Sequence, residues 1–383
     1  MAAFSFNRIE IDLGALKNNF HRIQRSAGQQ VRVMAVVKSD AYGHGLVECA
    51  RALSDAGAET FGVAEVEEGV ALRRAGLAGE IVILLGAAPE SYEEVVAYDL
   101  TPVVYDLDAI AGLAAAASKK NGKVRVHLKV DVGMGRLGVA PAEVKSCVAL
   151  LKRLPSISLR GILSHLPSAD AAEKPEITRA HLSRFSEVLA GLKIGEPGVV
   201  HIANSAALIY FPGSRLDMVR PGISLYGCYP DALPARAQSA APGLELQPVM
   251  RFATRVIQVK ELEKGSGISY GHTYVTRRKS RIAVLPVGYA DGYLRKLSNR
   301  AEVLIGGRRA PVRGRVCMNA TMVEVTDLPP VRAGDEAVLL GRQGDAAISA
   351  DEVAGWMETI SYEVLCLLGS CNERVYLHPE MKR

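Results

Sequence analysis

The chain has 383 residues, of which 49% are hydrophobic and 23% are charged, and its formal net charge is +5. This length and hydrophobicity predict two globular domains with a large core. The basic residues are dispersed, the six cysteines and eight histidines show no metal-binding spacing, and no apolar run reaches the ~18 residues that would span a membrane. These observations argue against a nucleic-acid-binding protein, a metalloprotein and a membrane-spanning protein, and the scattered cysteines predict a cytoplasmic location with reduced thiols.

Short apolar runs alternate with segments of helical spacing over the first part of the chain. After an alternating run at 8–13 and a helix at 13–27, the first core strand, 31–37, ends at Lys38. Further strands are predicted at 60–64, 80–85, 101–106, 123–131, 156–166, 198–203 and 216–219. Eight β/α units in about 200 residues are typical of a parallel (β/α)8 barrel of the TIM type. The competing fold, an open doubly wound sheet, would need a G-x-G-x-x-G turn after its first strand, and the sequence has none there.

The pattern changes after residue 228. The segment 228–243 is rich in Ala and Pro and is typical of a linker. Short alternating runs then predict antiparallel strands, with one helix at 350–357; the runs lie at 249–260, 281–287, 301–305, 321–326 and 336–340. We therefore expect residues 1–235 to form the barrel and residues 236–383 to form a mainly antiparallel β domain, to which residues 1–12 could add a strand.

The residues that follow the barrel strands carry the candidate chemistry, because the carboxyl ends of the strands form the active face of such a barrel. Lys38 should be partly desolvated at its strand end, which would lower its pKa and make its amine a nucleophile toward aldehydes. The alternative is a structural lysine with a buried stem and a solvated ammonium group. The other strand ends contribute Tyr42, Lys129, Asp131, Arg136, His165, Asn204, Ser205, Arg220, Gly222 and Ile223.

The loops after the last two strands of such a barrel often bind phosphate. Ser205 opens a short helix, and Gly222 lets backbone N–H groups approach a ligand closely. A lysine that forms imines and faces a phosphate site indicates a phosphorylated aldehyde, and pyridoxal 5′-phosphate (PLP) fits that description. Taken alone, Ser205 could equally be an ordinary N-cap, and Gly222 could be a bend at a barrel corner.

Nine segments within residues 5–378 resemble the motifs of bacterial alanine racemases in order and spacing. They are VMAVVKSDAYGHG, HLKVDVGMGRLG, LSHLPSAD, HIANSAA, MVRPGISLYG, ISYGHTYV, PVGYADGY, GRVCMNATMVEV and ISYEVLC. The resemblance implies a cytoplasmic, PLP-dependent isomerase of fold type III that interconverts L- and D-alanine and supplies D-alanine for the peptidoglycan of the cell wall.

The resemblance also implies roles for individual residues. Lys38 would bind PLP covalently and act as one catalytic base, and Tyr270 would be the second base. Inversion needs two bases, because a proton leaves one face of the α-carbon and returns on the other. Arg220 would bond the pyridine nitrogen and leave it unprotonated, because a guanidinium does not release its proton. The phosphate would be bound by Tyr42, Ser205, Gly222, Ile223 and Tyr362, and we also assign Asn204 to the cofactor site.

The substrate site follows from the same resemblance. Arg136 would bond the phenolic oxygen of PLP and the substrate carboxylate, to which Met318 would donate a backbone N–H. His165 would lie between Arg220 and Tyr270. Lys129 matches a position that is carbamylated in many family members, where the carbamate orients Arg136. Tyr289 would line the entrance, and Asn319 stands where the family often has aspartate.

The implied assembly is a head-to-tail homodimer in which Tyr270 and Met318 of one subunit reach the site of the other. Three alternatives stay open. A PLP-dependent decarboxylase of basic amino acids is disfavoured by the G-M-G-R block and by the tyrosine of ISYGHTY. A broad-specificity or serine racemase is separated less well by the motifs. A PLP carrier would leave the predicted β domain without a role.

Overall fold

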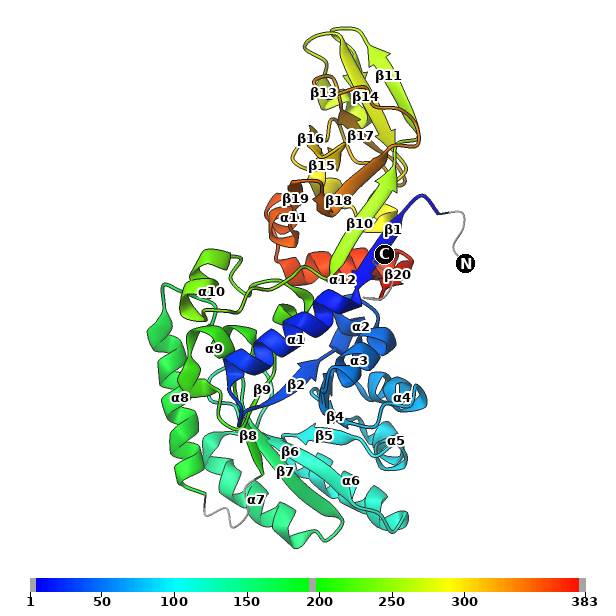
Figure 1. Cartoon of the computed structure of the whole chain (residues 1–383). Helices are drawn as coiled ribbons and strands as arrows, with labels where there is room; N and C mark the ends of the chain where they lie inside the picture. The colour runs from blue at the N-terminus through cyan, green and yellow to red at the C-terminus, as the bar shows by residue number, and fades with distance from the viewer. Residues whose placement is uncertain (1–4, 193–197, 379–383) are drawn as a thin grey trace. The chain divides into compact units, whose positions relative to one another are not determined.

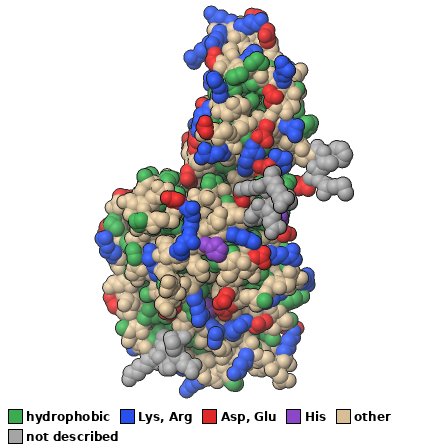
Figure 2. All heavy atoms as spheres, in the orientation of Figure 1, with side chains coloured by type: hydrophobic (Ala, Val, Ile, Leu, Met, Phe, Trp, Pro, Cys, Tyr) green, Lys and Arg blue, Asp and Glu red, His purple; other side chains and the backbone are tan. Residues whose placement is uncertain are grey.

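The computed structural model describes residues 5–192 and 198–378 and contains two compact units (Figure 1). The barrel unit comprises Leu16–Ala41 and Leu46–Gln247, and the β unit comprises Met1–Ala15, Tyr42–Gly45 and Pro248–Arg383. Lys and Arg side chains are scattered over the visible face of both units rather than gathered in one patch (Figure 2). None of the helices described in these ranges is long and apolar enough to cross a membrane.

Eight parallel strands form the barrel unit. They are β2 (Arg32–Val36), β3 (Thr60–Val63), β4 (Glu80–Ile83), β5 (Thr101–Val104), β6 (Val124–Lys129), β7 (Ile157–Leu163), β8 (Val199–His201) and β9 (Met218–Val219). Neighbours along the chain are neighbours in the sheet, and β9 pairs with β2. The backbone N–H of Arg220 donates to the carbonyl of Ala203 at 2.9 Å and joins the ends of β8 and β9, so the barrel is nearly closed.

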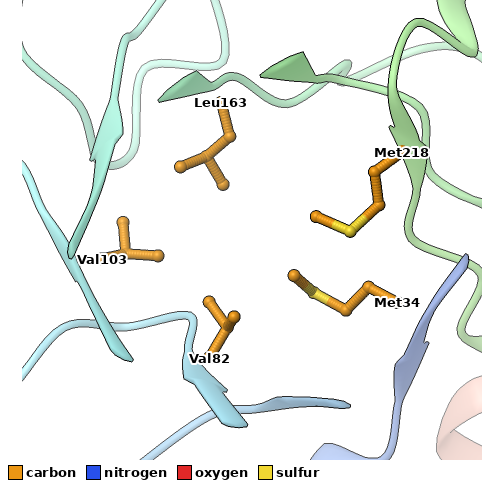
Figure 3. Packing of buried hydrophobic residues seen from close by; sticks show 5 residues of the cluster. All are labelled: Met34, Val82, Val103, Leu163 and Met218. Carbon is orange, nitrogen blue, oxygen red and sulfur yellow. The ribbon is translucent and has the colours of Figure 1, made fainter. Parts of the chain in front are cut away.

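Helices follow most of the strands, as the alternating pattern predicts. Those of the barrel unit include α1 (Leu13–Ala27), α2 (Lys38–Tyr42), α3 (Leu46–Asp55), α4 (Val66–Arg74), α5 (Tyr92–Ala97), α6 (Leu107–Lys119), α7 (Val144–Arg153), α8 (Pro175–Ala190) and α9 (Ser205–Tyr210). The first residues of α1, 13–15, and the last residue of α2, Tyr42, belong to the β unit. Inside the barrel, apolar side chains from five strands converge on a common centre (Figure 3); they are Met34, Val82, Val103, Leu163 and Met218. The centre of the barrel is therefore a packed core rather than an open channel.

The segment predicted as a linker contains a helix, α10 (Pro234–Ala240), and belongs to the barrel unit. The carboxylate of Asp231 accepts bonds from the Tyr210 hydroxyl and the Arg236 guanidinium, each at 2.7 Å. The same guanidinium lies 4.0 Å from the centroid of the Tyr210 ring. Part of this alanine-rich stretch is therefore helical, and the ion pair between Asp231 and Arg236 holds the helix in place.

The β unit is mainly antiparallel. Its strands are β1 (Arg8–Asp12), β10 (Met250–Arg255), β11 (Gln258–Leu262), β12 (Gly267–Ile268), β13 (Tyr274–Val275), β14 (Ser280–Leu285), β15 (Glu302–Ile305), β16 (Arg308–Pro311), β17 (Thr321–Glu324), β18 (Glu336–Gln343), β19 (Ala346–Ile348) and β20 (Arg374–Leu377). The largest sheet has the order β16-β15-β18-β10-β1-β20, and β19 pairs with β18. Two further helices belong to the unit, α11 (Ala350–Met357) and α12 (Ser361–Cys371). The fold class predicted from sequence, a (β/α)8 barrel followed by an antiparallel β domain, is confirmed.

Candidate active site

Lys38 lies just beyond the carboxyl end of β2, with Val37 between them, and the turn after it is left-handed. The four residues Ser39–Tyr42 have φ values of 53–55°. A left-handed conformation costs an L-residue about 1–2 kcal/mol, so this turn stores about 4–8 kcal/mol of strain that its surroundings must offset. None of the four residues is a glycine, and the sequence therefore gave no signal for the hand of the turn.

Backbone and carboxylate contacts hold the strained turn. The Asp40 carboxylate accepts the N–H of Leu46 at 2.7 Å, and the Glu68 carboxylate accepts the N–H of Asp40 at 3.3 Å. Glu68 also accepts the N–H of Ala64 at 2.7 Å, which ties the turn to the end of the neighbouring strand β3. The position of Lys38 is thus fixed by a network that extends over two strands of the barrel.

Cations gather at the carboxyl ends of the strands. Lys129, the last residue of β6, and Arg220, just after β9, are each only 6% exposed. Burial, followed by the charges of Arg136, Arg220 and Lys38, lowers the pKa of Lys129 to about 8. Within residues 5–192 and 198–378, no carboxylate forms an ion pair with Lys129, Arg136 or Arg220. Lys129 and Arg220 are therefore buried cations without an ion-paired carboxylate among the described residues, and an anionic ligand would relieve their charge.

The guanidinium of Arg220 is fixed by acceptors on the barrel strands. One nitrogen, Nη1, donates to His201 Nδ1 at 2.8 Å, while Nη2 donates to the Ser164 carbonyl at 2.7 Å and lies 3.5 Å from His165 Nδ1. Burial and the charge of Arg220 lower the pKa of His165 to about 3, with further contributions from Arg136, Lys129 and Lys38. His165 is therefore neutral and able to accept from Arg220.

The ends of β8 and β9 are joined by side-chain bonds. Asn204 caps α9 by accepting the N–H of Ala207 at 2.9 Å. The Ser205 hydroxyl accepts the N–H of Gly222 at 3.0 Å and that of Ser224 at 3.4 Å. The helical segments that follow β8 and β9 are thus held together at their first turns. Barrel phosphate sites are built in this way.

Asp131 organises the loop that carries Arg136, a role that the sequence did not reveal. Its carboxylate accepts the backbone N–H groups of Gly133, Met134 and Gly135 at 2.8–2.9 Å. Burial raises the pKa of Asp131, but these backbone bonds outweigh that effect and lower it overall. Only the side-chain contacts could identify this role, because Asp131 is one of several polar residues at the strand ends.

The remaining predicted residues lie in the β unit. Tyr270 is 68% exposed and Met318 is 55% exposed. Ser269 joins their loops, since its hydroxyl donates to the Arg315 carbonyl at 2.6 Å and contacts Cys317 Sγ at 3.3 Å. The rings of Tyr42 and Tyr362 lie 6.1 Å apart, and burial raises the pKa of Tyr42.

Known proteins match both units. A sequence model of the alanine racemase N-terminal domain matches residues 11–230, and a model of the C-terminal domain matches residues 249–376. The chain belongs to the alanine racemase family. The alanine racemase of Halothermothrix orenii is 46% identical over 370 residues, which cover 96% of each chain.

Solved structures of the family share the fold. The alanine racemase of Bacillus anthracis with bound L-Ala-P has a TM-score of 0.90 and 34% identity, and the match covers 99% of this chain and 97% of that one. The E. faecalis alanine racemase also has a TM-score of 0.90 at 34% identity, covering 98% of this chain and 100% of that one.

The family's predicted site residues therefore fall into two sets. The barrel mouth contains Lys38, Lys129, Arg136, His165, Asn204, Ser205, Arg220, Gly222 and Ile223. The β unit contains Tyr42, Tyr270, Tyr289, Met318, Asn319 and Tyr362. How the second set meets the first stays a prediction, as do the individual catalytic roles.

Proposed function

We propose that this protein is a PLP-dependent alanine racemase that interconverts L- and D-alanine. Membership of the family supports the reaction, and its relatives are alanine racemases, which favours alanine over the broad-specificity or serine alternative. The observation that carries the proposal is the cationic barrel mouth beside Lys38, where Lys129, Arg136 and Arg220 have no ion-paired carboxylate within the described ranges.

These residues fit PLP, because its phosphate and its phenolic oxygen supply the negative charge that the mouth lacks. Lys38 would bind its aldehyde, and Arg220 would donate to its ring nitrogen. The phosphate would be bound by Tyr42, Ser205, Gly222, Ile223 and Tyr362, with Asn204 supporting the same region. When bound, PLP supplies an electron-withdrawing ring that acidifies the α-proton of the amino acid attached to it.

The proton transfers are assigned to Lys38 Nζ and the Tyr270 hydroxyl, on opposite faces of the substrate. Arg136 and the backbone N–H of Met318 would bind the substrate carboxylate and orient the α-carbon. Neutral His165, next to Arg220, would accept a hydrogen bond rather than add a positive charge near the reacting atoms. Tyr289 would line the entrance, a carbamate on Lys129 would orient Arg136, and Asn319 would set the environment of Tyr270.

We also propose a cytoplasmic homodimer in which Tyr270 and Met318 of each subunit complete the site of the other. The support is the exposure of both side chains in the single chain, together with the family resemblance. The D-alanine produced would be used in cell-wall synthesis.

The domain boundary after residue 235 stays a prediction as well.

The proposal is tested on the purified protein by a coupled assay for D-alanine, followed by borohydride reduction and peptide mapping. L-alanine should be racemised much faster than L-serine, and the reduced cofactor should be attached to the peptide containing Lys38. A cofactor-loaded protein that leaves L-alanine unchanged, or a label on the Lys129 peptide, would contradict the proposal.

A further inference from the structure

Two histidines inside the barrel extend the hydrogen bonds of Arg220 into the core. His201, on β8, and His127, on β6, are both buried, and their ring centroids are 5.0 Å apart. The distance from Arg220 Nη1 to His201 Nδ1 is 2.8 Å, and the distance from His201 Nε2 to His127 Nδ1 is also 2.8 Å. The three side chains thus form a single row of hydrogen bonds.

Because Arg220 is a donor at one end of this row, it determines which ring nitrogen of each histidine carries the proton. A guanidinium can only donate, so His201 must present a lone pair at Nδ1. Burial and the charge of Arg220 keep the pKa of His201 well below 6.5, so the ring is neutral and carries its proton on Nε2. That N–H points at His127 Nδ1, which must accept it. His127 is therefore also an Nε2–H tautomer, since burial and neighbouring arginines lower its pKa to about 3.

The strands beside His127 are shaped to admit its ring. The pairing of β6 with β7 shifts between Val126 and His127, which places Gly161 opposite the histidine. A Cβ atom at Gly161 would lie 2.8 Å from His127 Nδ1 and 2.9 Å from Cε1, so a side chain there would displace the ring. At the far end, His127 Nε2 has no hydrogen-bond partner among the described residues. An apolar residue would avoid that unpaired N–H, so packing alone does not account for a histidine here.

We propose that His127 is a positioning residue of the active site, whose Nδ1 holds His201 in the tautomer that accepts from Arg220. Without that acceptor, His201 could move its proton to Nδ1 and present a donor to the guanidinium, which would displace Arg220 from its position. The proposal goes beyond the proposed function but rests on it for one point, the assignment of Arg220 to the cofactor's ring nitrogen.

The direct test is the tautomer itself, read from nitrogen chemical shifts in holoenzyme labelled with ¹⁵N-histidine. His201 and His127 should both be neutral with the proton on Nε2, and the His127→Asn variant assigns the His127 signals by their loss. A charged His201, or one protonated on Nδ1, would overturn the proposal. This measurement needs no activity, so it stands even if alanine is not the substrate.

Three substitutions of His127 distinguish the effect of its hydrogen-bond acceptor from the effect of its side-chain volume. Asn places an amide oxygen near the position of Nδ1, Gln places it near Nε2, and Leu has no acceptor. His127→Leu should lower kcat about tenfold while KM for alanine changes less than about twofold, as expected for a residue that acts through another. His127→Asn should recover kcat to within about threefold, and His127→Gln should not.

Two outcomes of the substitutions would contradict the proposal. One is equal recovery by Asn and Gln, which would mean that only volume matters. The other is a Leu variant that keeps both its kcat and the native His201 tautomer. If the Leu variant fails to fold, the native tautomer and the Asn–Gln pair still decide the question. A native protein that does not racemise alanine would instead refute the proposed function.

Discussion

At the scale of single residues, Lys129 has the titration with the clearest consequence for stability. Its pKa is about 8 in the folded chain against an ordinary value of 10.5, because burial and Arg136 disfavour the ammonium form. Between pH 8 and 10.5 the unfolded chain binds a proton that the folded chain does not. The free energy of unfolding should therefore rise with pH across this window, and below pH 8 the full penalty of at most about 3 kcal/mol applies.

Replacing Lys129 by methionine should remove this pH dependence. In CO₂-free buffer, Lys129→Met should be about 1–3 kcal/mol more stable than the native protein at pH 7.5, and the difference should shrink toward pH 10. Urea unfolding at several pH values measures both curves. Added bicarbonate should stabilise only the native protein, since a carbamate on Lys129 would place a negative charge among the cations. Parallel curves, or stabilisation of both proteins, would show that Lys129 does not titrate as described.

At the scale of elements, the left-handed turn after Lys38 allows backbone strain to be tested separately from packing. Ser39 is exposed and has φ of 54°, so its substitution changes backbone strain with little change in packing. Ser39→Val should destabilise the protein by about 1–2 kcal/mol, because a β-branched residue is disfavoured there, whereas Ser39→Asn should be nearly neutral. Thermal unfolding of the two variants gives the comparison, and equal effects would mean that the turn relaxes to an ordinary conformation.

The loop that carries Arg136 gives a second prediction at this scale. Asp131→Ala removes the acceptor of three backbone N–H groups and should let Arg136, the proposed partner of the substrate carboxylate, move out of position. We expect KM for alanine to rise about tenfold, with a smaller change in kcat, because ground-state binding is what the loop provides. Asp131→Asn keeps one oxygen acceptor and should lie between native and alanine variants. A fall in kcat at unchanged KM would assign Asp131 a different role.

The elements also show where sequence patterns suffice. The barrel strands were predictable, since most are short and largely apolar runs with most residues buried, and this placed Lys38, Lys129 and Arg220 at the barrel mouth. The hand of the turn at 39–42 was not predictable, because no glycine indicates it. The contact of His127 with His201 joins residues 74 positions apart. It depends on the register shift opposite Gly161, which no local pattern records.

At the scale of the whole molecule, the β unit carries two exposed side chains that matter for the proposed assembly. Tyr270 and Met318 are exposed on joined loops, and the family resemblance assigns both to the active site. Lys38 lies in the barrel unit and Tyr270 in the β unit, so the two proposed bases can come from one chain or from two. Subunit mixing distinguishes these arrangements without any knowledge of how the units are placed.

Lys38→Ala and Tyr270→Phe should each be nearly inactive, because each removes one of the two bases. When the variants are unfolded, mixed one to one and reassembled, a dimer with shared sites has one doubly altered site and one intact site. Random assortment makes half the dimers mixed, so roughly one quarter of native activity should return. If both bases came from one chain, every site would carry one lesion and no activity would return. Light scattering must show dimers, and a mass-tagged chain must confirm exchange. Under those conditions, a mixture without activity would mean that Tyr270 acts within its own subunit or is not the second base.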